Sequence, residues 1–166
     1  MSVTPARRSA GTNLVLVLFR VLLGLLFLSV WSSNVRKGLY GPDEYAALIR
    51  TYVEEGDAPA PSKDVMAFVA DEAAVFARLQ LAGELVLGTL LVLGLATRPA
   101  GVAAGLFLSA LWLSELGVPN EWFWSLVFPA TAAFAVALLS AGRTLGLDAL
   151  LLDRSPLHRL PRWAVG

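Results

Sequence analysis

Apolar residues gather in four stretches of the chain, separated by short polar segments. A membrane-spanning helix needs about 20 mostly apolar residues, and each stretch reaches that length. They run roughly over Leu14 to Ser33, Val75 to Ala96, Pro99 to Val118 and Trp122 to Ala141. The links at 97–99 and 117–120 are short and rich in Pro and Gly, so successive helices should run antiparallel. The pattern predicts an all-α integral membrane protein built as an antiparallel four-helix transmembrane bundle, a single domain over residues 1–166.

Composition supports this class and removes several others. The 166 residues are 57% hydrophobic and only 16% charged, whereas soluble domains are about 45–50% apolar and about 25% charged. The formal net charge is zero and no dense basic block occurs, so we expect no nucleic acid partner. With no cysteine and a single histidine, His158, the chain offers neither thiolate ligands nor a histidine pair. We therefore expect no metal or haem.

The first apolar stretch has a second interpretation, a cleavable signal peptide behind Arg7 and Arg8. The apolar core of a signal peptide spans only about 7–15 residues, and this run is longer. The sequence Val30-Trp31-Ser32 is also no small-residue cleavage site. We expect the helix to remain in the mature protein.

Basic residues favour one orientation of the bundle. A four-span topology places seven of them on one side and four on the other. The first set is Arg7, Arg8, Arg98, Arg143, Arg154, Arg159 and Arg162, and the second is Arg36, Lys37, Arg50 and Lys63. The more basic side is normally cytoplasmic, so we expect a multi-pass plasma-membrane protein with both termini and the tail 142–166 in the cytoplasm. Four tryptophans then lie near the outer interface, as an aromatic belt requires: Trp31, Trp112, Trp122 and Trp124.

The outer loop, residues 34–74, is too long for a simple turn and predicts structure of its own. Pro42 begins a helix that Gly56 ends. Its apolar residues repeat with helical spacing: Tyr45, Leu48, Ile49, Tyr52 and Val53. The amphipathic helix would lie on the membrane surface or over the mouth of the bundle, either as an ordinary surface helix or as a functional lid. From Ser62 a second helix is expected to continue into the second span.

Four charged residues lie within the apolar stretches: Arg20, Arg78, Glu84 and Glu115. A charge at membrane depth is costly and usually faces the bundle interior with a partner. Counting the helical rise from the ends of the spans brings Arg20 near Glu84 in depth, and Arg78 near Glu115. We predict both pairs. Each pair is either interhelical glue or part of a site.

Glu84 has the more specific setting of the two carboxylates. Gln80, Glu84 and Gly88 recur every four residues and share one helix face, and Arg20 shares its own face with Gly24. We predict a polar cleft between the first two spans, with Glu84 and Arg20 as catalytic residues and Gln80, Gly24 and Gly88 as ligand contacts. A buried carboxylate is suited to proton transfer, and reduction of a quinone consumes two protons. A quinone is the candidate ligand, although many other ligands suit such a cleft.

Several segments of the chain resemble the DoxX/DoxD family. They are Leu18-Phe19-Arg20-Val21-Leu22-Leu23-Gly24, Gly83-Glu84-Leu85-Val86-Leu87-Gly88, Gly94-Leu95-Ala96-Thr97-Arg98 and Ala141-Gly142-Arg143-Thr144-Leu145-Gly146-Leu147-Asp148. The resemblance implies a small four-span membrane protein, and DoxD members are described as a subunit of thiosulfate:quinone oxidoreductase. Arg20, Glu84 and the 142–148 segment match the polar positions of the family. Within that last segment we expect Arg143 to pair with Asp148 at the head of a short interfacial helix.

Two functions are compatible with these observations. In the first, the chain is an integral membrane subunit of a quinone-linked oxidoreductase such as thiosulfate:quinone oxidoreductase, and a second redox subunit carries the electron-transfer cofactor. In the second, it is a non-catalytic membrane scaffold or a small-solute permeation protein. Four spans are too few for a repeat-based transporter, so permeation would require a homo-oligomer.

Overall fold

The computed structural model describes residues 10–139, 141–143 and 145–154. Their regular secondary structure is entirely helical, with no strand among them. The elements are α1 (Ala10–Lys37), α2 (Pro42–Glu55), α3 (Ala60–Asp71), α4 (Ala73–Leu93), α5 (Thr97–Ser114), α6 (Trp124–Leu138), the 3₁₀ turn η1 (Ala141–Arg143) and α7 (Leu147–Arg154). The all-α prediction is confirmed.

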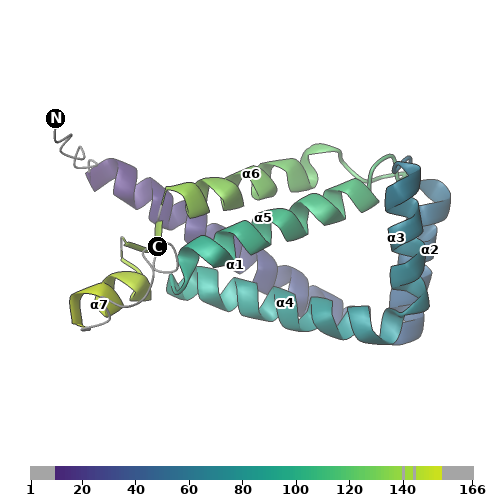
Figure 1. Ribbon diagram of the computed structural model, residues 1–166, viewed down its shortest axis with the longest axis horizontal. Coiled ribbons are helices and arrows are strands. Elements are labelled where there is room, and N and C mark those ends of the chain that lie inside the picture. The colour runs from purple at the N-terminus through teal and green to yellow at the C-terminus, as the bar shows by residue number, and fades with distance from the viewer. Residues whose placement is uncertain (1–9, 140, 144, 155–166) are drawn as a thin grey trace.

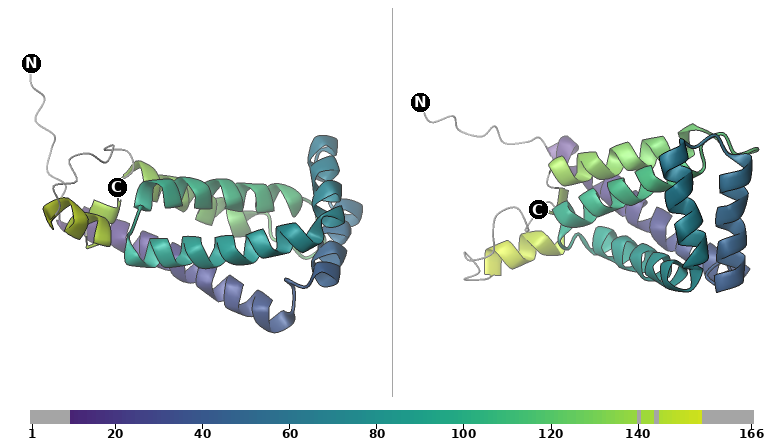
Figure 2. Two further views of the ribbon diagram at one scale, coloured as in Figure 1. Left: turned by 60° about the horizontal axis from the view of Figure 1, so that its bottom comes forward. Right: turned by 45° about the vertical axis from the view of Figure 1, so that its right-hand side comes forward.

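Four long helices make up the body of the molecule, and shorter helices lie at its two ends (Figure 1). Helices α1, α4, α5 and α6 run along the length of the molecule, and α1 packs chiefly on α4 while α5 packs on α6. Helices α2 and α3 stand side by side across one end of these four, and α7 lies at the other end (Figure 2). We call the α2–α3 pair the cap.

Two helices within the described ranges are long and apolar enough to cross a membrane, Gly11–Lys37 and Ala73–Leu93. Helix α5 has 18 residues and α6 has 15. At about 1.5 Å per residue both are shorter than the ~30 Å hydrocarbon core of a bilayer. Spans three and four therefore stay a prediction.

The junction of α3 and α4 differs from the expected continuous helix. The helix that precedes the second apolar stretch begins at Ala60, and it ends at Asp71. Glu72 separates it from α4, with φ −99° and ψ 30°. Because α3 lies against α2 across the end of the bundle, the chain has to turn at Glu72 before α4 can run along it (Figure 1).

Helices α1 and α4 cross at two glycines. A Cβ atom on Gly24 would lie 2.8 Å from the carbonyl oxygen of Gly88 and 2.7 Å from the backbone nitrogen of Val92. A Cβ on Gly88 would lie 2.8 Å from Cγ of Leu28 and 3.1 Å from the carbonyl oxygen of Gly24. Such approaches exclude any side chain, so glycine at both positions lets the two backbones touch. The pairing of 24 with 92 and of 28 with 88 shows that the helices are antiparallel.

Buried apolar side chains form two separate clusters. The first fills the space between the four long helices: Leu16, Leu23, Phe27, Leu91, Ala100, Ala104, Leu108, Ala130, Ala133, Val136 and Ala141. The second joins the cap to the start of α4: Tyr45, Ile49, Ala58, Met66, Ala70, Ala73 and Ala77. The cap is therefore packed on the bundle through its own core.

Candidate functional site

Glu84 is buried on α4, with 1% of its surface exposed. Both of its carboxylate oxygens accept hydrogen bonds from neutral groups. The hydroxyl of Tyr40 donates to Oε2 over 2.5 Å, and the amide Nε2 of Gln80 donates to Oε1 over 2.9 Å. A buried carboxylate is tolerable only when its oxygens are hydrogen-bonded, and the two donors meet this requirement.

The hydrogen bonds continue into the cap. The hydroxyl of Tyr45 donates to Oε1 of Gln80 over 2.8 Å. Tyr40 lies in the turn between α1 and α2, Tyr45 lies in the first turns of α2, and Gln80 and Glu84 are one turn apart on α4. We call these four side chains the Glu84 network. It forms where the α1–α2 turn meets the face of α4 beneath the cap.

Both tyrosines of the network are held in the neutral form. Burial raises the pKa of Tyr40 above its ordinary value, and its hydrogen bond to Glu84 raises it further, whereas a hydrogen bond with Asn34 opposes the rise. Burial also raises the pKa of Tyr45, as does the charge of Glu84. Because a neutral phenol carries its proton, each hydroxyl is available as a donor to the network at physiological pH.

Arg20 does not face Glu84, so the predicted ion pair is wrong. Arg20 lies four residues before Gly24, and Glu84 lies four residues before Gly88. Since α1 and α4 are antiparallel and the two glycines touch, the charged residues lie on opposite sides of the crossing. A rise of 1.5 Å per residue separates them by about 12 Å along the helices.

The guanidinium of Arg20 instead holds the segment that follows α6. Its Nη1 donates to the carbonyl oxygen of Ala141 over 3.3 Å, and its Nη2 donates to that of Leu145 over 3.1 Å. Asp148 attracts it electrostatically. Only 2% of the Arg20 surface is exposed. Arg20 is therefore a structural anchor for the C-terminal part of the described chain.

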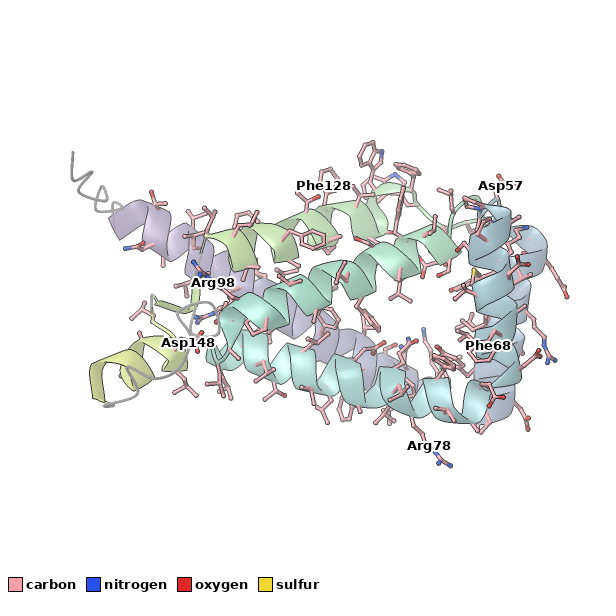
Figure 3. The ribbon with its side chains drawn as sticks, in the orientation of Figure 1. Asp57, Phe68, Arg78, Arg98, Phe128 and Asp148 are labelled. Carbon is pink, nitrogen blue, oxygen red and sulfur yellow. The ribbon has the colours of Figure 1, made fainter. Side chains whose placement is uncertain are left out.

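Asp148 completes this anchor from the other side (Figure 3). Its carboxylate accepts from the backbone N–H of Ala96 over 2.8 Å and from that of Thr97 over 2.9 Å. Its own N–H donates to the carbonyl oxygen of Gly94 over 2.9 Å. Asp148 thus caps the beginning of α5 while it begins α7. We name Arg20, Asp148 and the backbone that they bind the Arg20–Asp148 clamp.

The expected partner of Asp148 was Arg143, whose side chain lies outside the described residues. The carboxylate of Asp148 binds backbone groups at the start of α5. Glycines give the clamp its space. A Cβ on Gly94 or on Gly146 would strike the guanidinium of Arg20, and one on Gly142 would strike Thr97 and Asp148. The Gly-rich segments that carry the family resemblance thus have a packing explanation.

The second predicted pair, Arg78 with Glu115, is also wrong. Arg78 is exposed and points away from the bundle (Figure 3). Its neighbour Ala77 is fully buried in the contact with the cap. Successive residues of a helix point about 100° apart, so Arg78 faces away from that contact. Glu115 follows the end of α5, beside the link where the N–H of Asp57 donates to Leu116 over 2.6 Å. No ion pair joins these two described residues.

Sequence reasoning missed Tyr40 and used Tyr45 only as part of an apolar stripe. The spacing of Gln80 and Glu84 did predict their contact, because residues four apart on a helix are neighbours. Tyr40 is 44 residues away from Glu84. No local sequence pattern predicts a hydrogen bond between residues so far apart. The available signal is that a buried carboxylate needs donors, and the polar side chains of the preceding outer loop, including its tyrosines, are candidates.

Two apolar helices of membrane-spanning length, one of which carries a buried and hydrogen-bonded carboxylate, are typical of a helical membrane protein. Within the described ranges, no group of three or more His, Cys, Asp or Glu side chains is arranged to hold a metal ion. Residues 15–160 match the family model DoxD, described as TQO small subunit DoxD, in which TQO is thiosulfate:quinone oxidoreductase. The chain belongs to the DoxD family. Searches of curated proteins and of solved structures found no match.

Proposed function

We propose that this chain is the integral membrane subunit of a quinone-linked oxidoreductase, and that Glu84 delivers protons to the quinone. The description of its family as the small subunit of thiosulfate:quinone oxidoreductase supports the class of complex and a partner subunit. The observation that carries the proton role is the burial of Glu84 between two neutral donors, Tyr40 and Gln80.

The chemistry requires a proton donor inside the membrane. A quinone takes up two electrons and two protons to become a quinol. The partner subunit would supply the electrons by oxidising the donor, which for this family is thiosulfate. Among the described residues, Glu84 is a buried carboxyl group and Tyr40 is a phenol hydrogen-bonded to it, so the two can pass a proton between them. A carboxylic acid or a phenol fits the carbonyl oxygens of a quinone ring, because each can donate a hydrogen bond to them.

Tyr40 connects Glu84 to the surface of the molecule. It is partly exposed, whereas Glu84 is buried. In a four-span topology with both termini in the cytoplasm, the cap and Tyr40 lie on the outer side of the plasma membrane. Protons would then pass from the outer aqueous phase through Tyr40 to Glu84, while Gln80 and Tyr45 hold the carboxylate in place.

The Arg20–Asp148 clamp gives Arg20 a structural role in place of the catalytic role that the sequence predicted. Since its guanidinium binds Ala141 and Leu145, its effect on the site is through the fold of the bundle. Gly24 and Gly88 let α1 and α4 touch, and in this proposal that contact forms the floor of the site. We assign proton transfer to Glu84 and Tyr40 alone.

The test is Glu84→Gln in the assembled complex, which keeps the shape and removes the exchangeable carboxyl proton. Loss of a general acid typically costs about 100-fold or more in rate, so we expect quinone-dependent turnover to fall by that order. Glu72→Gln is the matched control, because Glu72 is exposed between α3 and α4. Full turnover in a well-folded Glu84→Gln complex would contradict the proposal and favour the scaffold or permeation alternative.

A further inference from the structure

Trp31 carries a polar group that the fold leaves unused. Its indole Nε1 is buried, and within the part of the chain that the structure describes it has no hydrogen-bond partner. By contrast, Nε1 of Trp112 donates to the carbonyl oxygen of Phe123 over 3.0 Å. A buried donor without an acceptor is costly and calls for an explanation, such as a ligand, an ion or water at the position it faces.

The position of Trp31 follows from the crossing of α1 and α4. Trp31 lies seven residues after Gly24, which is two turns, so it points to the same side of α1 as Gly24 does. Glu84 lies one turn from Gly88 on the antiparallel helix, and both residues are displaced from the crossing in the same direction. The helical rise places them about 10 Å and about 6 Å from the crossing, respectively.

The side chains of Trp31 and Glu84 tilt toward the same level along the axes of α1 and α4. Helical side chains tilt toward the N-terminus of their own helix. The indole of Trp31 therefore tilts back toward the crossing, and the carboxylate of Glu84 tilts away from it. Both come from the facing sides of α1 and α4, under the turn that carries Tyr40. The Glu84 network and the unused N–H of Trp31 thus belong to the same interior region.

We infer that Trp31 is a binding residue of this site, and that its Nε1–H donates to a carbonyl oxygen of the quinone ring. The inference rests on the proposed function for the identity of the ligand. A quinone suits the arrangement because its ring carries two carbonyl acceptors on opposite edges and its head carries no donor that would compete. One acceptor meets Trp31, and the other would meet Glu84 in its protonated form, which takes up its proton through Tyr40.

The experiment measures binding of decylubiquinone to the purified full chain. Nanodiscs of ether-linked phospholipid are used, because they lack ester carbonyls that could accept from the indole. Trp31→Phe and replacement of Trp31 by benzothienylalanine, which keeps the shape of the indole without its N–H, should both weaken binding. One hydrogen bond corresponds to roughly a two- to tenfold rise in Kd. Trp112→Phe is the control and should leave Kd unchanged.

The outcomes distinguish the inferred role of Trp31 from the proposed quinone-linked function. If the benzothienylalanine protein binds decylubiquinone as tightly as the wild-type chain, the inference is wrong, even when Glu84→Gln abolishes turnover. If the wild-type chain binds no decylubiquinone, the quinone proposal and the inference both fall. Weakened binding in both Trp31 variants, with unchanged affinity in Trp112→Phe, supports Trp31 as a ligand contact.

Discussion

The hydroxyl of Tyr40 and the carboxylate of Glu84 are joined by a 2.5 Å hydrogen bond that spans 44 residues of sequence. The phenol belongs to a turn at the edge of the cap, and the carboxylate belongs to the interior of α4. This bond ties the turn that leads into the cap to the interior of α4, and the bond from Tyr45 to Gln80 ties the cap itself to the same network.

Tyr40→Phe should weaken both the fold and the activity. Removing the phenol leaves a buried carboxylate oxygen without its donor, which typically costs about 1–3 kcal/mol. It also removes the surface end of the proposed proton path, so turnover should fall while the apparent affinity for quinone changes little. Thermal unfolding and steady-state kinetics measure the two effects.

Tyr52→Phe is the control for that variant. Tyr52 is a partly buried tyrosine of α2 that is not one of the four side chains of the Glu84 network. Its removal should leave turnover unchanged. Equal losses in the two variants would show that the effect of Tyr40 is not specific to its bond with Glu84.

Gly88→Ala should destabilise the crossing of α1 and α4. The added methyl group would meet Leu28 and the carbonyl oxygen of Gly24 at 2.8 and 3.1 Å, and overpacking of this kind costs about 1–3 kcal/mol. Gly83→Ala, on the same helix, meets nothing within 4 Å and should be neutral or slightly stabilising because alanine favours helix. Unfolding in detergent compares the two, and indistinguishable midpoints would refute the close contact.

Asp148→Asn should loosen the end of the molecule that carries α7. An amide has one acceptor oxygen where the carboxylate has two, so one of the N–H groups at Ala96 and Thr97 loses its partner. We expect faster cleavage by protease after residue 139, with near-normal turnover in the intact fraction. Arg78→Met changes an exposed charge and should have no such effect. A loss of turnover without added protease sensitivity would assign Asp148 to the chemistry instead.

The three tyrosines should ionise only in strongly alkaline solution. Burial, followed by the charges of Glu115 and Glu121, raises the pKa of Tyr52 to about 12. Burial is also the main reason that the pKa values of Tyr40 and Tyr45 are raised. Between the ordinary tyrosine pKa of about 10 and the raised values, the unfolded chain has lost protons that the folded chain keeps. The resulting stability is therefore complete below pH ~10 and falls as the pH rises above it.

Absorbance near 295 nm follows tyrosine ionisation in the folded protein and after denaturation. We expect the folded curve to lie at higher pH than the denatured curve for all three residues. Coincident curves would contradict the burial of the network.

Local patterns predicted much of this protein, since apolar periodicity marks helices and a four-residue spacing marks the contact of Gln80 with Glu84. The partners of Arg20 were not predictable in the same way. Depth along two helices can be compared only when their crossing point is known, and counting from the ends of the spans placed that point wrongly. Gly24 and Gly88 mark it in the structure. Gly24 follows Arg20 by four positions, and Gly88 follows Glu84 by four. Because the two helices are antiparallel, this equal spacing places the two charged residues on opposite sides of the crossing.

The contacts of Asp148 also affect the order in which parts of the protein can fold during its synthesis. The N–H groups of Ala96 and Thr97, at the turn between α4 and α5, take their acceptors from a residue synthesised about fifty positions later. While the ribosome is still making α6, that turn exists without its cap and Arg20 exists without its acceptors at 141 and 145. The bundle can close fully only after residue 148 has emerged, so a pause in translation during α6 leaves the nascent protein with its first three long helices made and with the end that Arg20 and Asp148 join still open.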